Sequence, residues 1–176
     1  WSIPADSRTA INGKWKKGPG KKLTKVIKKA TKGASIIAED LGVVGENVRA
    51  LIQKTGWPGM KILLFAFDDE NGANEYLPHN YASENCIVYG GTHDNDTIVG
   101  YYKEKSDEEI KFVKQYLGIS KKEDLPRAMI RCGYASIAKT AVFQMQDILA
   151  LDNSARMNCP STVGTNWKWR MLPNQF

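Results

Sequence analysis

The feature that most limits the fold of this sequence is an almost continuous apolar run over residues 60–67. A parallel strand covered by helices on both faces has this composition, whereas a half-exposed strand alternates apolar and polar residues. We therefore predict a buried parallel strand over 60–67. Residues 35–38, 86–91 and 141–147 are predicted as further strands, since each is a short stretch rich in apolar residues.

Helical periodicity separates these predicted strands. Helices are predicted over residues 21–30, 46–54, 96–103, 107–117 and 125–139, where apolar residues recur at spacings of three and four. Strands that alternate with helices along a chain predict an α/β fold built on a parallel sheet.

The boundaries of two of these helices can be predicted. Ser106 with Glu109 three residues later is typical of an N-terminal capping box, and Gly118 is typical of a helix end. At the start of the 96–103 helix, we expect Asn95 or Asp96 to be the N-cap, because short polar side chains cap helices well.

Polar segments with acidic residues follow two predicted strands. Glu39 and Asp40 come directly after residues 35–38, and the motif GGTHDNDT (residues 90–97), which contains Asp94, completes the strand at 86–91. Paired carboxylates on neighbouring strand ends can cleave a glycosidic bond. From the pattern alone, Glu39 could also be a structural acid in a salt bridge, and Asp94 could be a helix cap. Strand alternation turns Asp40 away from Glu39, so we expect Asp40 to be structural.

The charge of the chain has a simple interpretation. The net charge of +6 comes largely from residues 14–32, which hold nine lysines and no acidic residue. Because apolar residues recur through 23–30, we interpret the lysines as the solvated face of an amphipathic helix. Nucleic acid is not an expected partner, since aromatic residues are not interleaved with the lysines. No apolar stretch approaches the roughly 18 residues of a membrane span, so we expect no membrane partner.

Metal and disulfide chemistry are also not expected. The three cysteines are widely spaced and odd in number, and the two histidines, His79 and His93, lie far apart. This pattern provides neither a disulfide framework nor metal-ligand spacing. It indicates a reducing, cytoplasmic location.

The fold class leaves two architectures open. A (β/α)8 barrel takes about 250 residues, so four strands with their helices amount to half of one. An open doubly wound sheet is the alternative, although no GxGxxG motif supports its nucleotide-binding versions.

Six motifs follow one another along nearly the whole chain. They are IAEDLG (37–42), PGMK (58–61), FAF (65–67), LPHNY (77–81), GTHDNDT (91–97) and NWKWR (166–170). These motifs and their order resemble the 4-alpha-glucanotransferases, also called amylomaltases or disproportionating enzymes.

The resemblance implies a catalytic TIM-type (β/α)8 barrel, of which residues 1–176 are the C-terminal half. It would transfer α-1,4-glucan segments from a glucan donor to a sugar acceptor by a retaining mechanism, without cofactor or metal. Glu39 matches the general acid/base, Asp94 the third carboxylate, and His93 a ligand of the same sugar ring.

Further sugar contacts are expected outside these motif centres. Phe67 and Asp69 could contact glucan, although a core aromatic residue and a loop-capping acid are equally open, and His79 is a similar candidate. In the C-terminal stretch, an amide, an indole and a guanidinium are suited to sugar binding. They belong to Asn158, Trp167 and Arg170.

The family's nucleophile has no counterpart in this chain. By the resemblance it precedes Trp1, and Asp6 matches no family motif. We therefore expect the isolated chain to be inactive without the N-terminal half of the barrel. An α-glucan hydrolase or branching enzyme is the alternative activity, and a non-catalytic glucan-binding remnant is an alternative of another class.

Overall fold

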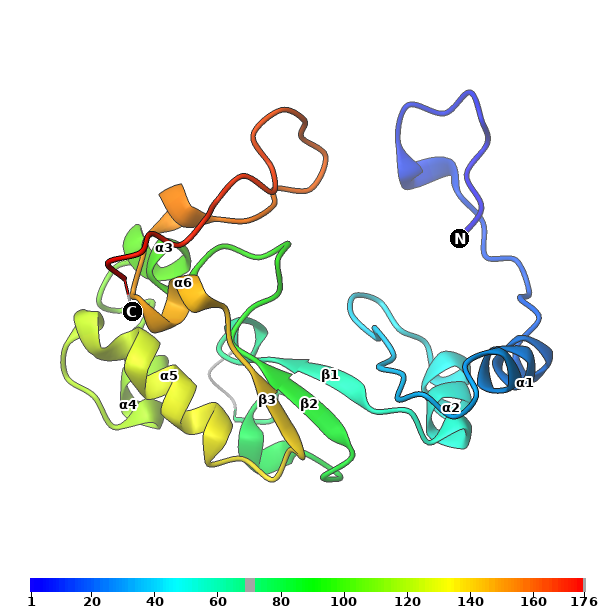
Figure 1. The fold of residues 1–176 in the computed structure, drawn as a ribbon, viewed down its shortest axis with the longest axis horizontal. Coiled ribbons are helices and arrows are strands. Elements are labelled where there is room, and N and C mark those ends of the chain that lie inside the picture. The colour runs from blue at the N-terminus through cyan, green and yellow to red at the C-terminus, as the bar shows by residue number, and fades with distance from the viewer. Residues whose placement is uncertain (69–71, 176) are drawn as a thin grey trace.

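The fold is built on a parallel sheet. The computed structural model describes residues 1–68 and 72–175. Within them the strands run parallel in the order β1-β2-β3 (Figure 1). The helices and strands are α1 (Lys21–Ala30), α2 (Glu46–Thr55), β1 (Gly59–Ile62), β2 (Cys86–Tyr89), α3 (Ile98–Lys103), α4 (Lys111–Leu117), α5 (Leu125–Tyr134), β3 (Thr140–Val142) and α6 (Met145–Ile148). Short 3-10 turns lie at Ala10–Asn12, Leu63–Phe65, Pro78–Asn80, Lys122–Asp124 and Asn153–Ala155. The predicted α/β fold with a parallel sheet is confirmed.

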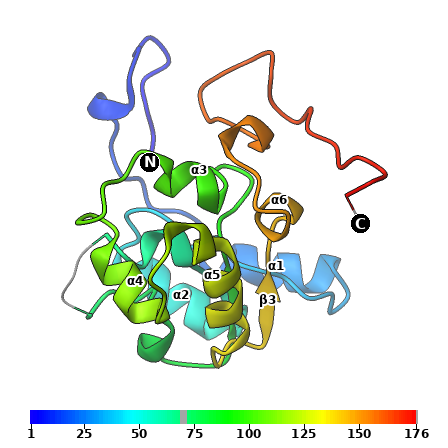
Figure 2. The same cartoon turned by 90° about the vertical axis from the view of Figure 1, so that its left-hand side faces the viewer.

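The hydrophobic core lies between the sheet and one group of helices. Helices α3, α4 and α5 lie together on one side of the strands, whereas α1 and α2 lie beyond the start of β1 (Figures 1 and 2). Ile62, Val88, Ile98 and Met129 are fully buried in this core. Removing each such side chain from water stabilises the fold by roughly 1.5–3 kcal/mol.

Of the two predicted boundary signals of α4, only the one at its end is confirmed. The N-cap is Ile110 rather than Ser106, and the predicted capping box closes the turn before the helix. Glu109 Oε2 accepts hydrogen bonds from Ser106 N and Ser106 Oγ, both at 2.8 Å. Gly118 ends the helix in the left-handed conformation, with φ of 67°. The helix itself begins at Lys111, later than predicted, because residues 107–110 form turns. Helix α5 ends at Tyr134, earlier than the predicted residue 139.

The cap of α3 differs from the prediction. Thr97 is the N-cap, and its Oγ1 accepts from Gly100 N at 3.0 Å. Asn95 Oδ1 instead accepts from Thr92, and Asp96 Oδ1 accepts from Thr97 N. Asn95 and Asp96 are therefore engaged in the turns that lead into the helix.

All four strand predictions differ from the structure in extent or type. The strand predicted over 86–91 forms but ends at Tyr89. Residues 35–38 form no strand. Ala38 N donates to Pro58 O, but the next contact along the chain, from Met60 N, goes to the side chain of Asp40 and not to a main-chain oxygen. The backbone hydrogen bonds therefore do not continue as a ladder. The strand at 60–67 ends at Ile62, where the buried chain turns into a 3-10 helix. The last strand ends at Val142, and residues 145–148 form α6. In the run over 60–67, the end of the strand and the turn after it are equally buried, so an apolar run does not distinguish them.

The interpretation of α1 also needs correction. Its apolar residues do not face a core: Leu23 is 49% exposed and Val26 is 64% exposed. Its lysines are exposed, as predicted for a solvated face, and Lys21, Lys25 and Lys28 also line an open groove against α2. Among the described residues, no helix is long and apolar enough to cross a membrane.

Candidate active site

The carboxyl ends of the strands border one cavity of about 670 Å³. Segments that are far apart in sequence meet there, because parallel strands end at the same edge of a sheet. Residues from the segment before α2 and from the turns after β1, β2 and β3 form its wall. They include Glu39, Phe65, His93, Asp94, Phe143 and Gln144.

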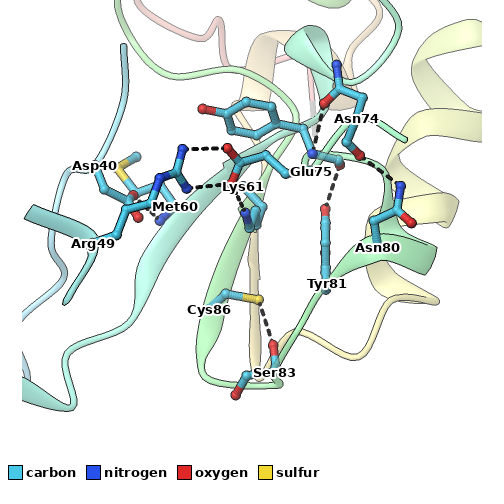
Figure 3. Close-up of polar contacts among 11 residues, drawn as sticks. Asp40, Arg49, Met60, Lys61, Asn74, Glu75, Asn80, Tyr81, Ser83 and Cys86 are labelled. Carbon is cyan, nitrogen blue, oxygen red and sulfur yellow. Dashed lines mark hydrogen bonds and ion pairs between the residues drawn. The ribbon is translucent and has the colours of Figure 1, made fainter. Parts of the chain in front are cut away.

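Glu39 reaches the cavity because its neighbours fasten the chain to β1. Ala38 N donates to Pro58 O at 2.9 Å. Asp40 Oδ1 accepts from Met60 N at 2.8 Å (Figure 3). A Cβ at Gly59 would collide with the Asp40 carboxylate, so this close approach requires glycine. Asp40 therefore has the structural role that we predicted, while the exposed Glu39 lines the cavity.

A tight turn after β2 presents His93 and Asp94. Asn95 Oδ1 accepts from Thr92 N at 2.8 Å and from Thr92 Oγ1 at 2.9 Å, and Asn95 N donates to Thr92 O at 3.1 Å. These hydrogen bonds close the turn, and the side chains of His93 and Asp94 within it are half-exposed. His93 Nε2 lies 3.4 Å from Asp94 Oδ1.

The C-terminal stretch packs on this turn through polar contacts. Asn158 Nδ2 donates to Asp94 Oδ1 at 2.6 Å, and Asn158 N donates to His93 O at 3.1 Å. Arg156 donates to the main-chain oxygen of Asp94 at 2.6 Å and to Asn158 O at 2.9 Å. The Asp94 carboxylate is thus oriented by an amide from a segment more than 60 residues away in sequence.

Trp167 completes the aromatic side of this cluster. Its ring centroid lies 5.0 Å from that of His93, with an angle of 41° between the planes. Trp167 N donates to Met157 O at 2.7 Å, which fixes the loop. The residue has a φ of 63°, a left-handed conformation that is strained for a side chain of this size.

Phe67 and His79, two predicted sugar ligands, lie away from the cavity. Phe67 packs edge-on against Phe112 and Tyr116, with ring centroids 6.1 and 5.5 Å away. His79 Nδ1 lies 2.9 Å from the Tyr116 hydroxyl, and its Nε2 lies 3.0 Å from Gly72 O. These are the contacts of a packing aromatic residue and a satisfied structural histidine.

Arg170, another predicted ligand, does not line the cavity either. Arg170 donates to the main-chain oxygens of Trp167 and Trp169, at 3.0 and 2.7 Å, and so braces the C-terminal loop. Asp69 lies outside the described residues. The structure brings together Glu39, His93 and Asp94 at the cavity, with Asn158 and Trp167 against the last two.

Asp147 is a buried acid that the sequence analysis missed. It is 1% exposed, its Oδ1 accepts from Ile98 N at 2.7 Å, and its Oδ2 has no hydrogen-bond partner among the described residues. Burial raises the pKa of Asp147 to about 6, and the Asp96 carboxylate acts in the same direction. Because it holds the first amide of α3, Asp147 supports the end of the turn that carries His93 and Asp94.

The residues that the sequence analysis missed differ in whether the sequence contained a signal for them. Asn95 stands in the GTHDNDT motif, but its part in closing the turn depends on backbone geometry. Asp147 lay inside a stretch predicted as strand, and the better signal was a polar pair, Gln146 and Asp147, directly after the last apolar residues. For the contact of Arg156 with the main chain, the sequence has no local signal.

Across residues 1–68 and 72–175, no three His, Cys, Asp or Glu side chains gather in a way that could hold a metal ion.

The geometry so far defines an α/β protein with acidic residues gathered at the carboxyl edge of a parallel sheet. The family model described as 4-alpha-glucanotransferase matches residues 1–174, and the chain belongs to this family. A 4-alpha-glucanotransferase of Thermus thermophilus is 45% identical over 182 residues, which cover 100% of this chain and 36% of that protein. A chloroplastic/amyloplastic one of Arabidopsis thaliana is 45% identical, over 97% of this chain and 29% of its own length.

Solved structures agree with this assignment. An amylomaltase from Streptococcus agalactiae, in complex with acarbose, superposes with a TM-score of 0.90 at 39% identity. The match covers 98% of this chain and 35% of that protein. The amylomaltase of Corynebacterium glutamicum has a TM-score of 0.59 at 17% identity, which supports the fold alone. The chain therefore spans about a third of the length of these relatives.

Proposed function

We propose that this chain supplies the acid/base part of an enzyme that transfers α-1,4-glucan segments between maltooligosaccharides or starch-like glucans. The observation that carries the proposal is the meeting of Glu39, His93 and Asp94 at one cavity on the carboxyl edge of the sheet. Family membership supports the same reaction class.

Glu39 is the general acid/base in this proposal. Its carboxyl group protonates the leaving glycosidic oxygen in the first step and then deprotonates the 4-hydroxyl of the incoming sugar. The anchoring of Ala38 and Asp40 to the start of β1 suits this role, because the acid must keep its position between two proton transfers.

Asp94 and His93 bind the sugar ring whose bond is broken. The Asp94 carboxylate accepts hydrogen bonds from sugar hydroxyls and favours the positive charge that develops on the ring. Asn158 holds one carboxylate oxygen, which leaves the other free for the sugar. The indole of Trp167, beside His93, offers an apolar surface on which a pyranose can stack.

The nucleophile comes from outside residues 1–176 in this proposal. A retaining mechanism needs a second carboxylate about 5–5.5 Å from the acid/base. The short parallel sheet, with its order β1-β2-β3, supplies the C-terminal half of a (β/α)8 barrel, and a preceding half closes it. The coverage of about a third of the relatives' length supports this division.

The first experiment follows the products from maltotriose. In the protein as its gene encodes it, we expect glucose together with longer maltooligosaccharides, and Glu39→Gln should lower the rate by about 10²–10⁴-fold. Glucose and maltose without longer products would favour hydrolysis over transfer. The chain of residues 1–176 alone should give no products, and turnover by it would overturn the assignment of the nucleophile.

A binding experiment separates a catalytic site from a glucan-binding remnant. The relative from Streptococcus agalactiae was solved with acarbose, so we expect acarbose to shift the imidazole NMR signals of His93 and leave those of His79 unchanged. Asn158→Leu should weaken this binding, since it frees the Asp94 carboxylate from its partner. Acarbose binding in a complete protein without turnover would favour the remnant.

A further inference from the structure

The lysine-rich part of the chain forms a groove that the glucan site does not use. It lies between α1 and α2 and encloses about 440 Å³. Lys21, Lys25 and Lys28 reach it from one face of α1, at spacings of four and three residues, and Lys54 reaches it from the end of α2. Residues three or four apart share one helix face, so the spacing itself concentrates the positive charge.

This charge has no carboxylate to balance it. Within the described ranges, none of the ion pairs includes a lysine of the groove, and the sequence has no acidic residue between Asp6 and Glu39. Like charges one helical turn apart repel each other. Helix α1 therefore forms with a local repulsion that an anion in the groove would relieve.

The groove is also partly preorganised. Lys28 Nζ donates to Thr55 O at the end of α2, which holds this ammonium group between the two helices. The hydroxyl groups of Thr24 and Thr55 already donate to main-chain oxygens, at 3.2 and 2.6 Å. The donors left for a ligand are therefore ammonium groups, which bind phosphate as point charges.

The lining of the groove limits the kind of anion. Its residues are lysines, threonines and one leucine, Leu51, and no aromatic side chain of the described structure lines it. Single-stranded nucleic acid binds to grooves where bases stack on aromatic side chains. A small ligand with concentrated negative charge fits better than a nucleic acid strand.

We propose that the α1–α2 groove binds a multiply charged phosphate group. The group can belong to a free polyphosphate or to a phosphorylated sugar, since both present the same oxygen atoms. The site is separate from the cavity that holds Glu39 and Asp94, because the two share no lining residue. Its ligand would thus bind to the protein without competing for the glucan.

The test measures binding by calorimetry in the protein as its gene encodes it. The probes are pyrophosphate and glucose 6-phosphate, with sodium chloride at matched ionic strength as the control for unspecific screening. The groove variant is Lys21→Gln with Lys25→Gln, which leaves the contact of Lys28 intact. The matched variant is Lys22→Gln with Lys29→Gln, which removes the same charge from α1 outside the groove. Glutamine and lysine have similar helix propensities, so both variants should keep α1 helical.

We expect the groove variant to weaken pyrophosphate binding by about 10-fold, and the matched variant by less than about 3-fold, because only the former removes ligands in direct contact. Pyrophosphate bound more tightly than glucose 6-phosphate would identify a free polyphosphate as the ligand, and the reverse order a sugar phosphate. Equal losses in the two variants, or no binding at about 10 mM probe, would overturn the proposal. Tighter binding of a short single-stranded RNA would also overturn it.

Discussion

Residues 1–57 and residues 58–175 are built on different principles. In the first region Thr55 alone is buried, and large apolar side chains such as Ile11 and Val43 are 84% and 93% exposed. In the described part of the second region, the sheet and α3–α5 enclose the whole hydrophobic core. Both regions contain regular helices, so a helix does not by itself indicate a stable core. The first region takes its position from contacts with the second.

Few contacts join the two regions. Arg49 of α2 donates two hydrogen bonds to Glu75, at 2.7 and 3.0 Å, and Lys61 of β1 donates to the same carboxylate at 2.9 Å (Figure 3). The hydrogen bond from Met60 N to Asp40 lies beside them. Leu41 of the first region also packs against the core. The junction therefore combines these polar contacts with the apolar packing of Leu41, whereas the second region is held together by apolar burial.

A pair of leucine substitutions should give the largest contrast between the regions. Leu64 is fully buried, so Leu64→Ala should lower the free energy of unfolding by about 2–5 kcal/mol. Leu23→Ala, at a half-exposed position on α1, should change it by less than about 0.5 kcal/mol. Urea unfolding followed by circular dichroism measures both, and losses of similar size would show that the regions share one core.

The buried acid Asp147 should make the second region sensitive to pH. Its folded pKa of about 6 lies above the ordinary value of 3.8, so the folded state retains a proton that the unfolded state loses. Stability should therefore fall as pH rises from about 4 to above 6, by about 3 kcal/mol in all. Asp147→Asn keeps an oxygen acceptor for Ile98 N and should remove this loss.

The measurement compares urea unfolding of the two proteins at pH 4 and pH 7.5. The other ionisable groups are the same in both proteins, so their contributions cancel in the difference. If wild type and Asp147→Asn lose stability in parallel, then Asp147 is ionised in the folded state and the raised pKa is wrong.

Two glycines offer a matched test of how the regions unfold. Gly56 ends α2 with φ of 72° and Gly118 ends α4 with φ of 67°, and neither has a neighbour that a Cβ would meet within 4 Å. Alanine at either position should cost about 1–2 kcal/mol of local backbone strain. Gly118→Ala should lower the free energy of cooperative unfolding by that amount, because α4 packs in the core.

Gly56→Ala should leave this cooperative unfolding unchanged and increase opening of α2 alone. Hydrogen exchange of the α3 amides measures the cooperative unfolding, and exchange of the α2 amides measures the opening of α2 alone. Equal slowing or equal acceleration of both sets in the two variants would mean that the regions unfold as one unit.

The contrast between the regions also explains what the sequence could predict. Helices α1 and α2 were predicted because periodicity and local end signals depend on neighbouring residues. The strand over 60–67 was predicted too long, because Leu63 and Leu64 are as deeply buried in a 3-10 turn as they would be in a strand. For α1, periodicity identified an apolar face but could not say what covers it, since that depends on distant segments.

The candidate site shows the same limit. His93 and Asp94 could be predicted because their motif follows a strand that does form. Glu39 was identified by its IAEDLG motif, although the strand predicted before it does not form. The partners that orient them could not be predicted, since Asn158 and Asp147 reach the turn from distant segments. The motifs that contain Phe67 and His79 matched the family equally well. Only the three-dimensional packing shows that these two side chains contact Tyr116 instead of lining the cavity.

The smallest predicted effect tests the junction itself. The hydrogen bond from Arg49, followed by those of Lys61, lowers the pKa of Glu75 to about 2 from its ordinary 4.5. A lowered pKa adds stability above about pH 4.5, and this stability is lost as pH falls through 2. Because the Glu75 side chain is 42% exposed, solvent screening reduces its contribution to about 1 kcal/mol.

Glu75→Gln should therefore release α2 from β1 at pH 7 while leaving the core intact. We expect faster hydrogen exchange in α2 and little change in α3–α5. Glu84→Gln is the matched control, because Glu84 also pairs with a lysine, Lys139, at 3.1 Å, but within the second region. If Glu75→Gln instead destabilises α3–α5 as much as α2, then this ion pair supports the core, and the division between the two regions at residue 57 is misplaced.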